Sequence, residues 1–295
     1  MSLHDGGPAR IVYLGSPDIA VAPLEALVAA GHDVALVVTN PDRRRGRGSD
    51  PSPTPVKAAA QRLGLPVSHE LADVLGVDAA FGIVVAYGHI IGNDVLDALP
   101  LVNIHFSLLP RWRGAAPLER AILAGDEETG VCLMQIVEAL DEGDVYARQV
   151  VPVGDATLDE LRERLVQASC DLLVEAMREG FPEPEAQTGE PVYARKIRPE
   201  EHQLHFDRPA VELVRVIRLG RAWTTLGGAR FRIPAASVDP TPTGETTPGA
   251  LDGLRVATGE GWLVLETVQP EGKRATAAAD WRRGARLADD TVLGG

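Results

Sequence analysis

The sequence predicts an α/β fold with a mostly parallel sheet, followed by a small second domain rich in β-structure. Two observations predict the first part: short runs that are apolar on both faces alternate with helical segments, and each helical segment ends at a glycine. Such strands are buried on both faces, which happens when helices cover a parallel sheet. One observation predicts the second part, because from residue 229 onward short β-prone runs are separated by glycine and proline.

The elements of the first part follow from these runs in chain order. Glycine directly after a helical pattern marks its end, because glycine adopts the left-handed conformation that stops a helix. The expected strands are 10–15, 33–38, 65–67, 78–85, 102–105, 130–137 and 146–153. The expected helices are 24–30, 54–63, 115–124 and 157–179, followed by Gly31, Gly64, Gly125 and Gly180.

The remaining segments set the expected domain boundaries. Residues 1–9 are small, polar and rich in glycine, which indicates a disordered leader. We expect the first domain over 10–185, a linker over 186–204 and the second domain over 205–295, because proline, glycine and glutamate are frequent around the linker. The expected elements of the second domain are a helix at 209–219 and strands at 229–233, 253–257 and 261–268. Together they indicate a small β-barrel.

Composition and charge exclude several classes of protein. The net charge of −13 argues against general nucleic-acid binding, and the longest apolar stretches are about half of the roughly 20 residues that a membrane helix needs. The two cysteines, Cys132 and Cys170, are too few for a disulfide framework or a cysteine-rich zinc site. No phosphate-binding glycine loop or three-glycine dinucleotide motif is present. We expect a cytoplasmic protein without a metal or a membrane partner, and we expect a monomer.

Three polar residues are expected at one edge of the sheet. Asn103 and His105 lie two residues apart on an otherwise apolar strand, so their side chains share a face. Asp141 lies in the turn 140–144, from which a carboxylate can reach the same edge. Sites in α/β sheets lie just past the carboxyl ends of strands. The alternative interpretation is that Asn103 and His105 are hydrogen-bonded structural groups.

These three residue types suit addition to a carbonyl group. Asparagine supplies a neutral donor to an oxyanion, histidine moves a proton near pH 7, and aspartate orients the histidine and stabilises its charge. The set holds no serine or cysteine nucleophile. Direct transfer to an incoming nucleophile therefore fits better than a covalent acyl-enzyme.

The same residues resemble the formyltransferases that use 10-formyltetrahydrofolate. The motif from Asn103 to His105, the Ser-Leu-Leu-Pro run at 107–110, and Asp141, 38 residues after Asn103, match the catalytic pattern of that family. Further stretches resemble the branch of the family that acts on tRNA. They are 10–18, the basic loop 40–48 with 53–57, 111–117, and the C-terminal runs 248–249, 253–259 and 269–273.

The resemblance implies a Rossmann-like formyltransferase domain, followed by an OB-like C-terminal barrel. It also implies transfer of the formyl group from 10-formyltetrahydrofolate to the amine of methionyl-initiator tRNA, by direct attack of that amine. Asn103 and His105 would stabilise the oxyanion, and Asp141 would assist proton transfer. The residues implied for folate binding are Val84, Val85, Ala86, Tyr87, Gly88, Ser107, Leu108, Leu109 and Pro110, and those implied for tRNA binding are Arg43, Arg44, Arg45 and Arg47.

Other functions would keep the same three site residues. A formyltransferase acting on a sugar amine or another small amine would dispense with the tRNA, and a formyl-folate hydrolase would replace the amine by water. An RNA-binding module without activity is a further alternative, which the acidic first domain disfavours. The basic loop and the barrel-like second domain favour the tRNA substrate.

Overall fold

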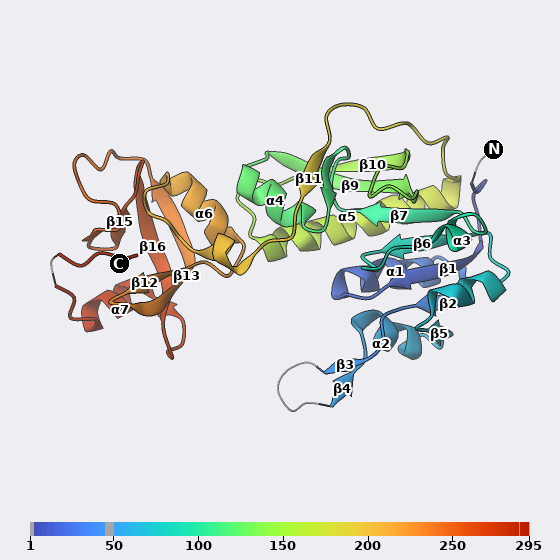
Figure 1. The fold of residues 1–295 in the computed structure, drawn as a ribbon, viewed down its shortest axis with the longest axis horizontal. Coiled ribbons are helices and arrows are strands. Elements are labelled where there is room, and N and C mark those ends of the chain that lie inside the picture. The colour runs from blue at the N-terminus through green and yellow to red at the C-terminus, as the bar shows by residue number, and fades with distance from the viewer. Residues whose placement is uncertain (1–2, 45–49, 289, 295) are drawn as a thin grey trace. The chain divides into compact units, whose positions relative to one another are not determined.

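The computed structural model describes residues 3–44, 50–288 and 290–294, and the chain divides into two compact units (Figure 1). The first unit holds the residues up to Pro117, together with Glu128–Pro152 and Arg162–Ala194. The second unit holds Leu118–Glu127, Val153–Leu161 and the residues from Arg195 onward.

A seven-stranded sheet forms the first unit, in the order β10-β9-β7-β6-β1-β2-β5 (Figure 1). Its strands are β1 (Arg10–Gly15), β2 (Asp33–Val38), β5 (Val67–Ser68), β6 (Phe81–Val85), β7 (Leu101–His105), β9 (Glu128–Gln135) and β10 (Val145–Pro152). The strands from β7 to β5 pair in parallel, while β9 pairs antiparallel with both β7 and β10. The predicted α/β class with a mostly parallel sheet is confirmed.

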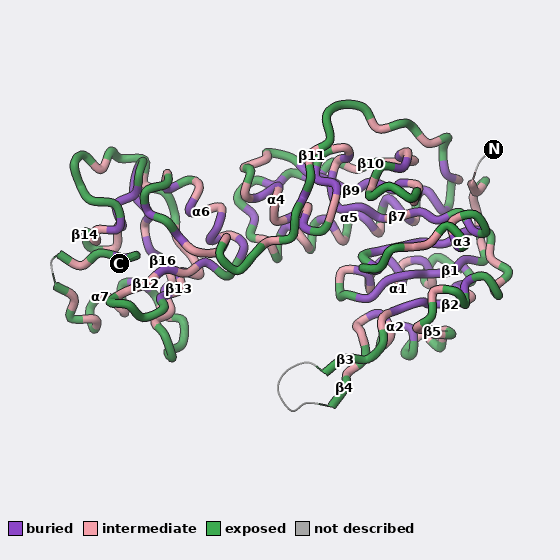
Figure 2. The backbone as a smooth tube through the Cα atoms, in the orientation of Figure 1, coloured by how far each residue is buried: buried purple, intermediate pink, exposed green. Residues whose placement is uncertain are grey.

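The strand β1 lies inside the sheet because its residues are apolar on both faces. Its side chains from Ile11 to Leu14 are fully buried, and Figure 2 shows β1 and the neighbouring β6 as buried segments. Ile11 lies opposite Phe81 of β6, and Tyr13 lies opposite Val37 of β2. The carboxyl ends of β1, β2 and β6 therefore lie side by side.

Helices connect these strands or, for the last of them, follow the sheet in the chain. They are α1 (Val21–Ala29), α2 (Pro55–Arg62), α3 (Asn93–Leu96), α4 (Pro117–Ala124) and α5 (Leu158–Glu179). All but the short α3 are predicted from the sequence, within a few residues of their bounds. Thr54 begins α2, since its hydroxyl oxygen accepts a hydrogen bond from the backbone N–H of Lys57 at 3.0 Å.

The structure contains strands and hydrogen bonds in several segments for which the sequence predicts no strand or helix. The hairpin strands β3 (Arg43–Arg44) and β4 (Pro51–Ser52) pair antiparallel, and β8 (Arg111–Gly114) pairs in parallel with β11 (Val192–Ala194). The strand β11 lies in the expected linker. In residues 3–9, where a disordered leader is expected, the carbonyl of His4 accepts the backbone N–H of Phe181 at 3.0 Å.

The second unit contains a six-stranded antiparallel sheet, in the order β12-β13-β16-β15-β14, with β17 paired to β16. Its elements are α6 (Ala210–Arg218), β12 (Trp223–Leu226), β13 (Ala229–Asp239), β14 (Leu251–Asp252), β15 (Arg255–Ala257), β16 (Trp262–Pro270), β17 (Thr276–Ala277) and α7 (Ala278–Gly284). Single bridges from Leu226 to Leu293 and from Ala250 to Val292 join the two ends of the sheet. This closure agrees with the predicted small barrel.

Two observations hold for the described part of the chain. No helix there is long and apolar enough to cross a membrane. No group of three or more histidine, cysteine, aspartate or glutamate side chains there is placed to hold a metal ion.

Candidate functional site

Two of the three predicted catalytic residues lie together at the sheet edge. His105 ends β7 and is 5% exposed, while Asp141 lies in the turn between β9 and β10. The imidazole Nδ1 of His105 lies 3.7 Å from Oδ2 of Asp141. That separation exceeds a direct hydrogen bond, yet a carboxylate and a protonated imidazole attract strongly at this distance in a buried site.

The other nitrogen of His105 fixes the direction of the ring. Nε2 lies 3.0 Å from the backbone oxygen of Trp112, and a carbonyl oxygen can only accept a hydrogen bond. Nε2 therefore carries a proton and donates it to that oxygen. Nδ1 is left facing Asp141, as the ring nitrogen that can bind a substrate atom or exchange a proton.

Asp141 is held in place from a second side. The backbone N–H of Gly114, at the end of β8, donates to Oδ2 of Asp141 at 2.7 Å. Asp141 has a φ of 53°, in the left-handed region that few non-glycine residues adopt. Its carboxylate is therefore fixed between the end of β8 and His105.

Asn103 lies on the same side of β7 as His105. Its backbone is held in the sheet opposite Val84 of β6 and Met134 of β9. The side chain is half-buried, and no described residue forms a hydrogen bond with its amide. The structure thus places His105 beside Asp141. It leaves the Asn103 amide available to a ligand on the same face of β7.

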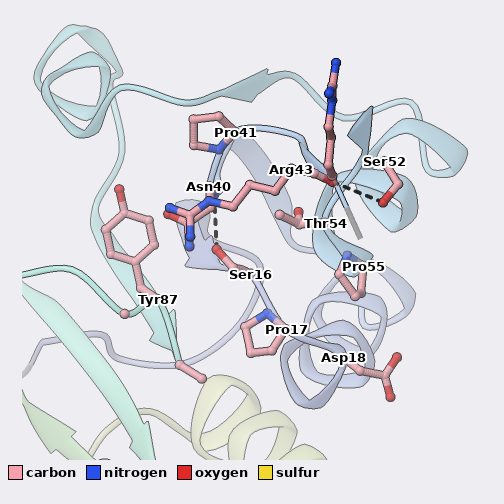
Figure 3. A pocket seen from close by; sticks show the side chains of 13 residues that line it. Ser16, Pro17, Asp18, Asn40, Pro41, Arg43, Ser52, Thr54, Pro55 and Tyr87 are labelled. Carbon is pink, nitrogen blue, oxygen red and sulfur yellow. Dashed lines mark hydrogen bonds between the residues drawn. The ribbon is translucent and has the colours of Figure 1, made fainter. Parts of the chain in front are cut away.

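A cleft of about 640 Å³ opens at the carboxyl ends of β1, β2 and β6 (Figure 3). Ser16, Asn40 and Thr54 supply polar groups to its lining, and Pro17 and Pro55 supply apolar ones. The residues that follow β6 complete one side of it, and the hairpin β3–β4 lies at its rim. A cleft with apolar walls and a few polar groups suits a ligand that carries both a ring system and polar substituents.

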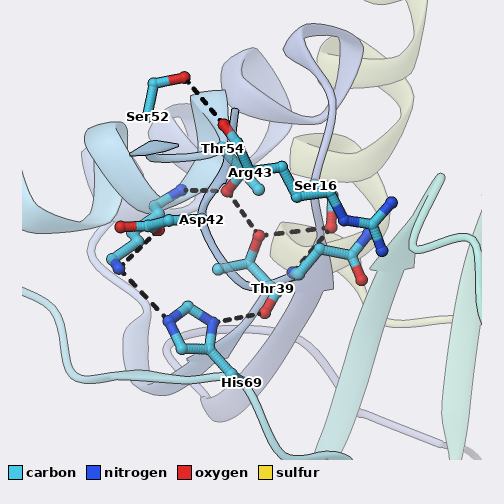
Figure 4. A network of polar contacts seen from close by, with 9 residues as sticks. Ser16, Thr39, Asp42, Arg43, Ser52, Thr54 and His69 are labelled. Carbon is cyan, nitrogen blue, oxygen red and sulfur yellow. Dashed lines mark hydrogen bonds and ion pairs between the residues drawn. The ribbon is translucent and has the colours of Figure 1, made fainter. Parts of the chain in front are cut away.

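Hydroxyl groups connect the walls of this cleft (Figure 4). Thr39 Oγ1 donates to Ser16 Oγ at 3.3 Å and lies 2.7 Å from Thr54 Oγ1. Ser16 Oγ also accepts the backbone N–H of Asn40 at 3.1 Å. These bonds tie the ends of β1 and β2 to the start of α2, so they hold the walls of the cleft together.

The predicted folate-binding residues fall into separate groups. Ala86, Tyr87 and Gly88 line the cleft, whereas Val84 and Val85 are buried in β6 and do not line it. Residues 107–110 form the turn after β7 and do not line it either; Ser107 Oγ donates to the backbone oxygen of Arg111 at 2.6 Å. Leu109 is buried, and Leu108 and Pro110 are half-buried.

Tyr87 presents a neutral hydroxyl at the cleft. Burial, and to a smaller extent the charge of Glu70, raise the pKa of the Tyr87 phenol above its ordinary value. The phenol therefore keeps its proton throughout the neutral range and can donate a hydrogen bond to a ligand.

The predicted tRNA-binding arginines lie at the rim of the cleft. Arg43 and Arg44 form β3, are exposed, and line the cleft. In Figure 3 the side chain of Arg43 extends over the cleft toward Asn40. Arg45 and Arg47 lie outside the described residues. The structure therefore places two residues predicted for tRNA beside three residues predicted for folate, in one cleft.

Two side chains that the sequence did not predict hold the Asp141 turn, defined here as residues 140–144. Nε2 of Gln187 donates to the backbone oxygens of Asp141 and Gly143, each at 2.8 Å. Arg113 bonds in turn to Gln187 and Glu142. Arg113 lies in the stretch 111–117, which carries part of the family resemblance, so the sequence does point to this residue. Gln187 lies in the expected linker, where no pattern points to it.

Two sequence models of one family match the chain, in order. The model described as formyl transferase matches residues 9–177, and the model described as its C-terminal domain matches residues 196–286. The chain is 42% identical to the methionyl-tRNA formyltransferase of Roseobacter denitrificans, over 97% of this chain and 99% of that one. It is 44% identical to the methionyl-tRNA formyltransferase of Roseiflexus castenholzii, with the same coverage of both chains.

Solved structures share the fold at lower identity. One is an N-formyltransferase from Helicobacter canadensis with folinic acid and dTDP-3-aminofucose, with a TM-score of 0.68 and 16% identity over 90% of this chain and 100% of that one. Another is the methionyl-tRNA formyltransferase from Clostridium thermocellum, with a TM-score of 0.57 and 16% identity over 78% of this chain and 94% of that one. Likeness at these identities shows the fold alone.

Proposed function

Because the chain belongs to the formyl transferase family, we propose that it transfers the formyl group of 10-formyltetrahydrofolate to the amine of methionine carried by initiator tRNA. One observation carries the proposal. Identities of 42% and 44% extend over nearly the whole of this chain and of relatives named for that activity, including the second unit.

The proposed reaction begins with the neutral amine. A free α-amine has a pKa of about 7.7–8.0, so a useful fraction is uncharged near pH 7. Its nitrogen forms a bond to the formyl carbon while the bond from that carbon to the folate nitrogen breaks. The amine loses one proton and the folate nitrogen gains one, so the reaction needs no other reactant.

Asn103 and His105 are the proposed oxyanion donors. The Asn103 amide is available because no described residue binds it. In His105, Nε2–H is committed to the carbonyl of Trp112, so the proton that can reach the oxyanion is the one on Nδ1 of the imidazolium. Both donors are fixed on β7, so they need no reorganisation as negative charge develops.

Asp141 is the proposed electrostatic partner of that imidazolium. Its Oδ2, 3.7 Å from Nδ1, stabilises positive charge on the ring without occupying the Nδ1 proton in a direct hydrogen bond. The gap leaves Nδ1–H without a direct bond to Asp141, so it can donate to a substrate oxygen placed beside it. Asp141 also serves as the acceptor of the amine proton, directly or through a water molecule, because both nitrogens of the imidazolium already carry protons.

Asn103, His105 and Asp141 do not line the cleft. We propose that the cleft holds parts of both substrates that lie away from the reacting carbon. Ala86, Tyr87 and Gly88 are assigned to the folate together with Val84, Val85 and residues 107–110, and Arg43 and Arg44 to phosphates of the tRNA. Contact of Arg43 with an anion is supported by its position over the cleft (Figure 3). We propose the same phosphate-binding role for Arg45 and Arg47, which lie outside the described residues.

The proposal extends to the organisation of the protein. The catalytic domain spans 10–185, the linker 186–204 and the C-terminal domain 205–295. We propose that the protein acts as a monomer in the cytoplasm, which sedimentation of the purified chain and fractionation of cells can test.

The function is tested by following a labelled formyl group. Purified protein is incubated with formyl-labelled 10-formyltetrahydrofolate and, separately, with methionyl-initiator tRNA, a nucleotide-linked amino sugar, or buffer alone. We expect label on the methionyl-tRNA and on no other acceptor. Label on the sugar would assign a small-amine formyltransferase, and formate released in buffer alone at the same rate would assign a hydrolase; either result refutes the proposal.

A further inference from the structure

We propose that Gln187 is a positioning residue for the reaction, which holds Asp141 in place through the backbone of the Asp141 turn. We propose that Arg113 fixes the direction in which the Gln187 amide points. The inference rests on the proposed function, because it concerns the same catalytic group. Gln187 belongs to the segment that follows α5, outside the motifs that carry the family resemblance.

Both hydrogens of the Gln187 amide are used on the Asp141 turn. They bind the backbone oxygens of Asp141 and Gly143, each at an N···O distance of 2.8 Å. The segment itself is anchored two residues earlier, where Glu185 and Val145 exchange two backbone hydrogen bonds of 2.8 and 2.9 Å. Gln187 therefore reaches the turn from a fixed backbone.

Arg113 sets the orientation of the Gln187 amide. Its Nε and Nη2 donate to Gln187 Oε1 at 3.1 and 2.7 Å, and its Nη1 donates to Glu142 Oε1 at 2.8 Å. Arg113 is only 8% exposed. A flipped amide would point its hydrogens at the guanidinium and its oxygen at two carbonyls, so these bonds allow one orientation only.

The hydrogen bonds form a closed circuit around Asp141. The Asp141 backbone oxygen binds Gln187, Gln187 binds Arg113, and Arg113 precedes Gly114, whose N–H binds Oδ2 of Asp141. The backbone and the carboxylate of one residue are thus held by a single connected set of groups. A shift of Gln187 would be transmitted to both.

The Asp141 turn needs such support because its conformation is strained. Asp141 itself has a φ of 53°, in the left-handed region that is costly for a residue other than glycine. The carboxylate must nevertheless stay 3.7 Å from Nδ1 of His105 to act on it. A misplacement of about 1 Å at a reacting group can lower a rate on the order of 10²-fold.

The decisive variant is Gln187→Glu. It keeps the shape of the side chain and an acceptor for Arg113, but a carboxylate cannot donate to the two turn carbonyls. Gln187→Ala removes both interactions. Thr188→Ala, at the next and exposed position of the same segment, is the matched control.

We expect kcat to fall on the order of tenfold to 10²-fold in Gln187→Glu and Gln187→Ala. The KM values for folate and tRNA should stay within about twofold of wild type, because neither substrate is assigned to Gln187. Thr188→Ala should match wild type. A role limited to stability would instead lower the Tm and leave the kcat of the folded enzyme unchanged.

Amide hydrogen exchange gives a readout that does not depend on activity. The Gly114 N–H is protected by Oδ2 of Asp141, so its exchange should accelerate in Gln187→Glu while β1 amides keep wild-type protection. Wild-type kcat in Gln187→Glu, or unchanged Gly114 exchange, overturns the positioning role. Absence of formyl transfer to tRNA by the wild-type protein refutes the proposed function instead, so the two failures are distinguishable.

Discussion

Backbone strain is concentrated at the site on the scale of single residues. Ala86, Trp112 and Asp141 have φ values of 46°, 66° and 53°, and they are three of the four described non-glycine residues in the left-handed region. Ala86 lines the cleft, Trp112 supplies the oxygen that binds His105, and Asp141 faces Nδ1 of His105. Such conformations cost about 1–3 kcal/mol each, so the surrounding structure must hold them.

The first residue-scale prediction concerns Asn103. Replacing it by alanine should lower kcat on the order of 10²- to 10³-fold, because one oxyanion donor is lost. The Tm should change little, since the amide binds no described residue. Steady-state kinetics and thermal unfolding measure both quantities. Asn93→Ala, at the exposed start of α3, is the control, and near-normal turnover by Asn103→Ala would remove Asn103 from the mechanism.

The sequence predicts some of these residues and not others, for a physical reason. Strand alternation puts Asn103 and His105 on one face, which the sequence shows directly. The Trp112 carbonyl escaped prediction because its role depends on a backbone angle, and the Trp112 side chain does not reveal that angle. Gln187 escaped prediction because its partners are backbone atoms more than 40 residues earlier in the chain.

On the scale of elements, the cleft is built from strand ends and one hairpin. The parallel strands β1, β2 and β6 end at the same edge, and α2 begins there with its capping residue Thr54. The hairpin β3–β4 adds two exposed arginines at the rim. Rigid elements thus form the walls, and the long basic side chains lie where a polyanion can reach them.

The prediction at this scale concerns the hairpin. Changing Arg43 and Arg44 together to alanine should raise the KM for tRNA, because phosphate contacts are lost, while the KM for folate stays close to wild type. The dependence of log KM for tRNA on log salt concentration should become shallower, by roughly one for each contact removed. Kinetics between low and moderate salt measure that slope.

A control separates the hairpin from general charge effects. Arg148→Ala removes an exposed arginine from β10, at the opposite edge of the sheet from the hairpin. It should leave both the KM and the salt slope unchanged. If the double variant behaved like this control, Arg43 and Arg44 would have no part in tRNA binding.

The elements themselves were predictable where the apolar pattern is strong. The strands β1, buried apart from Arg10, and β6, fully buried, follow from their runs of apolar residues. The long α5 follows from its amphipathic pattern. The strand β8 does not, because Arg-Trp-Arg-Gly has no apolar alternation, and β11 lies among prolines and glycines. Their pairing is a tertiary interaction between segments about 80 residues apart, which no local pattern encodes.

On the scale of the whole molecule, the net negative charge of the protein repels the proposed tRNA substrate. The chain carries −13, and tRNA is a polyanion. Salt at physiological concentration screens this repulsion beyond about 8 Å. Productive binding must therefore depend on local clusters of arginine rather than on the overall field, which is the reason to expect a strong effect from so small a hairpin.

The molecule-wide prediction concerns stability and pH. Burial, and then the charge of His4, lower the pKa of His32 below its ordinary value of 6.5, and its Nδ1 accepts the backbone N–H of Ala9. The unfolded chain therefore binds this proton more readily than the folded one. The contribution of His32 to the free energy of unfolding is fully present above pH 6.5. It is lost as the pH falls through the lowered pKa of the folded state.

His32→Asn tests this linkage, because the asparagine oxygen can accept the Ala9 N–H without titrating. The Tm of the wild type should fall between pH 7.5 and pH 5, and the fall should be smaller in His32→Asn. The dependence of Tm on pH will not vanish in His32→Asn, since burial also lowers the pKa of His202. His205→Asn, at an exposed position, should follow the wild type, and a His32→Asn slope equal to wild type would contradict the linkage.

The segment from Phe181 to Ala194 comes directly before Arg195, where the chain enters the second unit, yet it belongs to the first unit and contributes to the site through Gln187 and β11. Tethers between domains usually tolerate insertions and exchange, because few contacts cross them. Here the segment that precedes the second unit is instead part of the first unit and supports its chemistry. A chimera that imports a foreign C-terminal domain should therefore be spliced after Ala194, since a junction placed earlier would replace part of the catalytic centre along with the domain.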